Sequence, residues 1–123
     1  MDKVQALDKF WNSFGIPAYD ENSVPDDAKL PYITYNVVMD NLDNVVNMYA
    51  SIWYRSTSWR EVTLKACEIG KHIVEMYPPS IPFDDGRLYI ARGNPFAQRL
   101  SDPSDNMIRR IYLNIQVEYL SAF

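Results

Sequence analysis

Glycine, cysteine and histidine are scarce in this chain of 123 residues, which has four, one and one of them respectively. None of the glycines falls in a Gly-x-Gly-x-x-Gly or Walker pattern, so the usual phosphate-binding loops are excluded. A lone Cys67 cannot form an intramolecular disulfide. Cys67 and His72 are five residues apart in a predicted helix, which is about 140° of rotation, so they do not face each other as a nucleophile and its base must. We interpret Cys67 as a small residue near the buried edge of the helix and His72 as an exposed one.

Long apolar runs and a surplus of basic residues are also missing. No run approaches the roughly 20 residues that cross a bilayer, and no charged-then-apolar leader opens the chain. With a single cysteine, this predicts a soluble protein from a reducing compartment, without a membrane partner. The net charge of −4 and the pI near 4.8 argue against sequence-independent binding of nucleic acid, which depends on Lys and Arg.

The acidic residues do not form a site either. The pairs Asp26-Asp27, Asp84-Asp85 and Asp102/Asp105 lack the spacing of a calcium loop, and turn or cap formation explains them better. A hydrolase that uses Asp84, Asp85 or Asp105 would need two carboxylates facing each other across a cleft. We therefore expect no enzyme, no catalytic residue, no metal and no cofactor.

The clearest positive signal is the stretch 107–120. Its alternate positions are almost wholly apolar, while Arg110, Asn114, Gln116 and Glu118 occupy the opposite set. A period of two predicts a long strand with one buried face and a firmly fixed register. At about 14 residues this strand is far longer than usual, so we expect it to project past its own sheet and offer its backbone to another copy.

The first half of the chain predicts a helix, a connection and a hairpin. Apolar residues spaced three and four apart over 2–14 indicate an amphipathic helix that Gly15 closes. Residues 16–31 have no period and three prolines, which predicts an irregular surface connection. Strands are expected at 32–40 and at about 45–55, joined by a turn at 41–44.

The second half predicts a helix and a second hairpin. Ser58 and Glu61 have the spacing of a capping box at the start of a helix that runs to about Tyr77, with Glu61 and Lys65 as an exposed pair. Residues 80–83 are expected to be an extended connection, followed by a turn at 84–86 and a strand at 87–92. Gly93-Asn94-Pro95 is expected to break that strand.

These elements predict one α+β domain over 1–123, in the order α-β-β-α-β-β. The sheet is expected to be mainly antiparallel, with about four strands in two hairpins and both helices on one face.

Aromatic and arginine residues concentrate in two places that favour binding over chemistry, the strand-to-helix junction at 52–59 and the arginines Arg99, Arg109 and Arg110 beside the polar 101–106 connection. Tryptophan, tyrosine and arginine anchor many protein interfaces. Trp53 or Trp59 could instead close the end of the core. Arg99, Arg109 and Arg110 could form internal ion pairs with Asp102 and Asp105 that fix the polar 101–106 connection. The interface candidates are Trp53, Tyr54, Arg55, Trp59, Phe96, Arg99, Arg109 and Arg110.

Several segments resemble a family of head-tail joining and tail proteins of long-tailed bacteriophages and prophages. The likeness covers most of the chain from residue 31 onward. The segments are 31–35 (PYITY), 50–59 (ASIWYRSTSW), 85–88 (DGRL), 95–99 (PFAQR), 102–105 (DPSD) and 109–112 (RRIY).

The resemblance implies a tail terminator, also called a tail completion protein. Such subunits are α+β proteins that assemble into a hexameric ring, cap the tail tube and join it to the head-side connector or stopper protein, while DNA passes through the ring without specific binding. The implied location is the virion, after synthesis in the bacterial cytoplasm. Adaptor and stopper proteins are of similar size, and a monomeric protein-binding module that uses the same aromatic junction is the alternative from another class.

Overall fold

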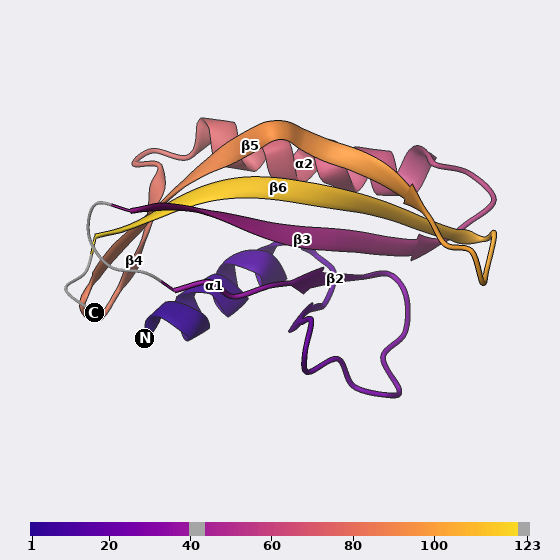
Figure 1. Ribbon diagram of the computed structural model, residues 1–123, viewed down its shortest axis with the longest axis horizontal. Helices are drawn as coiled ribbons and strands as arrows, with labels where there is room; N and C mark the ends of the chain where they lie inside the picture. Colours follow the sequence, from indigo (N-terminus) through magenta and orange to yellow (C-terminus); the bar gives the residue numbers. More distant parts are fainter. Residues whose placement is uncertain (40–43, 121–123) are drawn as a thin grey trace.

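A computed structural model describes residues 1–39 and 44–120 of the chain (Figure 1). It contains two α-helices, α1 (Lys3–Trp11) and α2 (Arg60–Glu75), and a short 3-10 helix, η1 (Asn12–Phe14). The strands are β1 (Ala18–Asp20), β2 (Tyr32–Tyr35), β3 (Val45–Arg55), β4 (Ser80–Phe83), β5 (Gly86–Ser101) and β6 (Ile108–Leu120). The predicted turn at 41–44 lies outside the described residues except for Asn44.

The strands form one six-stranded mixed sheet in the order β1-β2-β3-β6-β5-β4. The α+β class is confirmed, but the prediction of four antiparallel strands in two hairpins is wrong. β1 adds a parallel neighbour to β2, within a segment predicted to be irregular. β4 is a strand paired with β5 where we expected a connection. Both additions are short edge strands, which carry little periodicity.

β6 is the centre of the sheet. Its residues pair with β3 from Val45↔Glu118 to Arg55↔Ile108 and with β5 from Arg87↔Leu120 to Ser101↔Arg109. The long strand and its buried alternate face are confirmed. The expectation that it projects beyond the sheet is wrong, because both of its edges are already hydrogen-bonded.

β5 continues through the segment that was expected to break it. A bulge between Arg92 and Ala97 absorbs Gly93, Asn94 and Pro95, and pairing with β6 resumes beyond it. A bulge tolerates residues that a regular ladder excludes, because the extra residues are left unpaired. The strand therefore reaches Ser101 at the far end of the sheet.

The helices are capped differently from the prediction. In α1, Asp2 accepts a hydrogen bond from the Gln5 N–H at 2.8 Å and its own N–H donates to Gln5 Oε1 at 3.0 Å, a capping box that we did not predict. α2 has no such box, because it begins at Arg60 and Ser58 Oγ accepts from the Arg60 N–H. Gly15 ends η1 with a φ of 83°, as expected.

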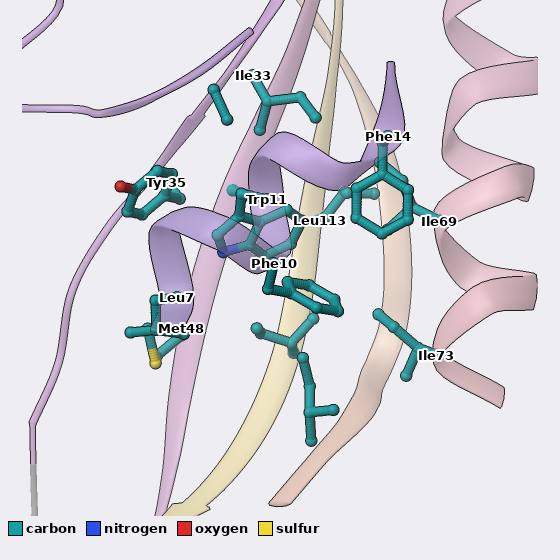
Figure 2. Packing of buried hydrophobic residues seen from close by; sticks show 14 of the residues in the cluster. Leu7, Phe10, Trp11, Phe14, Ile33, Tyr35, Met48, Ile69, Ile73 and Leu113 are labelled. Carbon is teal, nitrogen blue, oxygen red and sulfur yellow. The ribbon is translucent and has the colours of Figure 1, made fainter. Parts of the chain in front are cut away.

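Both helices contribute to one buried cluster, which covers one face of the sheet. Figure 2 shows α1 lying among strand residues, with Trp11 beside Tyr35 and Phe14 directed toward Ile69 of α2. The Trp11 and Tyr35 rings stack at 6.4 Å between centroids. Lys65 Nζ links the two helical layers by donating to the Phe14 carbonyl at 2.7 Å and to Glu68 at 3.1 Å, in place of the predicted pair with Glu61.

Candidate protein-interaction surfaces

The face of the sheet opposite the helices, which we call the open face, carries a row of aromatic side chains. On β3 the core residues Met48, Ala50 and Ile52 alternate with open-face residues. The cross-strand register places the open-face residues of β3 against those of β6. The pairs are Tyr49↔Asn114, Ser51↔Tyr112 and Trp53↔Arg110.

Trp53 and Arg110 form the most connected pair of the open face. The Arg110 guanidinium lies 4.4 Å from the Trp53 ring centroid, and its Nε donates to Ser51 Oγ at 3.0 Å. The indole N–H donates to Thr34 Oγ1 on β2 at 2.9 Å. These bonds hold both half-buried side chains flat along the sheet, so their apolar surfaces are presented already ordered. Ordering before contact lowers the entropic cost of binding.

Tyrosines extend the row on both sides of this pair. Tyr49 and Tyr112 stack at 5.3 Å with an interplanar angle of 24°. The Tyr49 hydroxyl donates to Glu21 at 2.6 Å, and this hydrogen bond, more than burial, raises the pKa of Tyr49. At the β1 edge, Tyr19 and Tyr32 meet edge to face at 5.7 Å. The open face thus bears an aromatic row made of Tyr19, Tyr32, Tyr49, Trp53, Arg110 and Tyr112.

A second cluster lies on the helix side, where β3 ends and α2 begins. Trp59 is flanked by two guanidinium groups, Arg99 at 5.0 Å and Arg109 at 5.3 Å from its ring centroid. Arg109 also donates to the carbonyls of Ser56 and Thr57, at 3.0 and 3.2 Å. This junction cluster of Trp59, Arg99 and Arg109 fixes the β3–α2 connection from within the chain.

The polar 101–106 connection is fixed by a different arginine from those considered. Arg55 forms an ion pair with Asp105. Two hydrogen bonds lower the pKa of Asp105. The larger effect comes from the Met107 N–H and the smaller one from Arg55. Asp102 accepts from the Ser104 hydroxyl and N–H, which lower the pKa of Asp102. The internal ion pair that we considered for Arg99, Arg109 and Arg110 is therefore formed by Arg55 instead.

The remaining candidates face the helices. Tyr54 is half-buried against the core, and burial raises its pKa. Phe96 packs so closely on α2 that a Cβ placed on Gly70 would lie 2.9 Å from its ring. Of the eight candidates, Trp53, Arg55 and Arg110 occupy open-face positions, and Arg55 is engaged there by Asp105. The four tyrosines of the row were not among the predicted candidates, although Tyr49 and Trp53 leave β3 without a plainly polar face.

A groove runs between α2 and the second half of β5, with a volume of about 550 Å³. Its lining is apolar at the centre, with Ala66, Phe96 and Ile111, and includes three cationic side chains, Lys71, Arg92 and Arg99. Cys67 also lines it and is exposed, which corrects our expectation of a position near the buried edge. No sequence pattern predicts this groove, because its two walls belong to separate elements, α2 and β5.

The lone histidine and the Cys, Asp and Glu side chains are the groups of this chain that could bind a metal. His72 is exposed, as expected, and packs edge to face on Phe14 at 5.2 Å. Among residues 1–39 and 44–120, no three His, Cys, Asp or Glu side chains come together to hold a metal ion. None of the helices described there has the length and apolar character needed to cross a bilayer.

Comparison with known proteins assigns no family to this chain. The chain matches no protein-family model and no curated protein sequence. The open face, the junction cluster and the groove are therefore the features from which we infer a function.

Proposed function

We propose that this protein is a structural component of a phage or prophage virion. It assembles as a ring on the end of the tail tube and joins the tail to the head-side connector. The observation that carries the proposal is the open face, where Trp53, Arg110 and the tyrosines form a preordered aromatic surface that no element of the described chain covers. Tryptophan, tyrosine and arginine are the residues that dominate the energetics of protein interfaces.

Other features of the molecule agree with this role. A rigid six-stranded sheet gives a ring subunit a fixed shape, and β6, paired on both sides, forms its centre. The net charge of −4 suits a channel through which DNA must move without sticking. The resemblance of residues 31–112 to tail terminators supplies the particular place in the virion. The neighbouring adaptor and stopper positions are the alternatives within the same class.

Binding to tail tubes tests the proposal. The tube protein encoded by the same genome would be assembled into tubes, mixed with the purified protein and sedimented. We expect the protein to sediment with the tubes and to be found at tube ends by electron microscopy. A protein that stays in the supernatant, or that decorates tube walls along their length, contradicts a terminator.

A matched pair of variants tests the part played by the open face. Tyr112→Ser removes one ring of the aromatic row, whereas Tyr77→Ser removes a tyrosine that is 97% exposed beyond the end of α2. We expect the first change to weaken sedimentation with tubes about tenfold or more, as loss of an interface anchor does, and the second to leave it unchanged. Equal binding by both variants would exclude the open face as the contact.

A further inference from the structure

The groove between α2 and β5 is unusual in an acidic protein because its charged lining residues are all basic. Lys71, Arg92 and Arg99 surround an apolar floor, and no Asp or Glu lines it. The Arg92 guanidinium lies 5.6 Å from the Phe96 ring centroid, which holds the cation at the apolar floor. Such a lining fits an acidic segment that also carries apolar side chains.

These cations are not neutralised within the described residues. The ion pairs found in 1–39 and 44–120 join Met1 to Asp84, Arg55 to Asp105 and Lys65 to Glu68. Lys71, Arg92 and Arg99 take part in none of them. All three side chains are exposed, so each can reach a carboxylate of a partner.

A segment with the complementary character lies on the opposite side of the same chain. The β1–β2 connection and the end of β1 carry Asp20, Glu21, Asp26 and Asp27, and no Lys or Arg occurs between residues 20 and 28. Asp26 and Asp27 are exposed and form no ion pair within the described residues. Val24 and Leu30, both half-buried, supply apolar side chains within the connection.

The two surfaces cannot meet within one copy. β1 is one edge of the sheet, and β5 lies next to the other edge. Figure 1 shows the β1–β2 connection on the side of the molecule away from α2. Contact between the surfaces must therefore join two copies.

We propose that the groove of one copy takes up the acidic β1–β2 connection of the next copy. This inference rests on the proposed function, since it names the subunit contact of the ring. The two surfaces differ, so each contact leaves a free groove at one end and a free connection at the other. Such a head-to-tail contact produces a closed ring when the rotation between subunits closes.

Disulfide trapping tests this contact, because Cys67 lines the groove and is the only thiol of the chain. In the Asp26→Cys variant, a thiol sits on the connection and another in the groove, on opposite sides of each copy. Mild oxidation of the full chain, alone and on tail tubes, should then link successive copies into a ladder of three or more on a non-reducing gel.

Two controls make the ladder specific. Asp85→Cys places the new thiol in the exposed turn between β4 and β5, away from the connection, and should give no more than linked pairs. Asp26→Cys combined with Cys67→Ser keeps the connection thiol but removes its groove partner, and should also stop at pairs. The absence of a ladder from Asp26→Cys, or a ladder from Asp85→Cys as strong as that from Asp26→Cys, would overturn the proposal.

Charge exchange gives an independent result. Lys71→Glu with Arg92→Glu should weaken self-association about tenfold or more, and Asp26→Lys with Asp27→Lys in the same chain should restore it. If wild-type copies associate and Lys71→Glu with Arg92→Glu does not weaken that association, the groove is not the contact, although the protein still assembles. If the chain also fails to bind tubes, the proposed function fails instead.

Discussion

Replacing Trp53 by Thr tests whether the Trp53 ring belongs to a binding surface or to the core. Threonine keeps the preference for a strand, so the change removes mainly the ring. The losses are the 2.9 Å hydrogen bond to Thr34, the 4.4 Å contact with Arg110 and the covered half of the indole. Together these contribute about 2 to 3 kcal/mol, from about 1 kcal/mol for the hydrogen bond, about 0.5 to 1 for the cation–π contact and about 1 for half-burial. Thr34 and Arg110 can then bond to water, so no orphaned group adds to the cost.

The matched change in the core is Trp11→Ala. Trp11 is 1% exposed and stacks on Tyr35, so its loss should lower the free energy of unfolding by about 3 to 5 kcal/mol. Urea unfolding followed by circular dichroism measures both variants, and sedimentation with tail tubes measures their binding. We expect Trp53→Thr to remain folded and to bind tubes poorly. A loss of stability as large as that of Trp11→Ala would place Trp53 in the core, and unchanged tube binding would refute its role in contact.

Two further changes test the bulge of β5 and the connection before β6. Gly93→Ala would place a Cβ 2.8 Å from Asn114 Cβ and 2.9 Å from its carbonyl oxygen, so the backbone must shift and urea unfolding should show a loss of about 1 to 3 kcal/mol. Gly70→Ala is the control, because its Cβ meets only the movable Phe96 ring and alanine favours the helix. Equal losses of unfolding free energy from both changes would contradict the strand pairing at the bulge. The pKa of Asp105 is lowered in the folded chain, so its contribution to stability is present above the ordinary value of 3.8 and is lost as the pH falls through the lowered pKa. Asp105→Asn should therefore flatten the fall in thermal stability at acidic pH, and an acid profile as steep as that of the unchanged chain would contradict this role.

The periodic segments were the predictable part of the fold. The alternation in 107–120 gave the buried face of β6, and the strand at 45–55 matches β3. The spacing of apolar residues likewise gave both helices. These signals are strong because burial on one face imposes a pattern on many consecutive residues.

The neighbours of each strand were not predictable by the same means. Alternation in β6 shows which side chains are buried but not which strands flank it, so a central strand was interpreted as a projecting one. β1 has three residues and β4 has four, which is too short for a period to appear. The break expected at Gly93-Asn94-Pro95 failed because pairing with β6 on both sides of the bulge holds the strand in place.

The candidate site was predictable only in part, for a related reason. Trp53 and Arg110 were chosen by residue type, and their meeting on one face depends on the register between β3 and β6. Arg99 and Arg109 were grouped with Arg110 by closeness in sequence. In the folded chain Arg109 points to the face opposite Arg110, because adjacent residues of a strand point to opposite faces. Arg99 pairs with Ile111 of the buried face, and both Arg99 and Arg109 contact Trp59 on the helix side.

The mass of the particle in solution tests the central claim most directly. Light scattering on a sizing column would be measured over a range of protein concentration and salt, with the chain alone and after release from tail tubes. We expect a closed ring of about six copies that weakens as salt screens the groove contact. A single copy under every one of these conditions, on tubes as well as in solution, would contradict it.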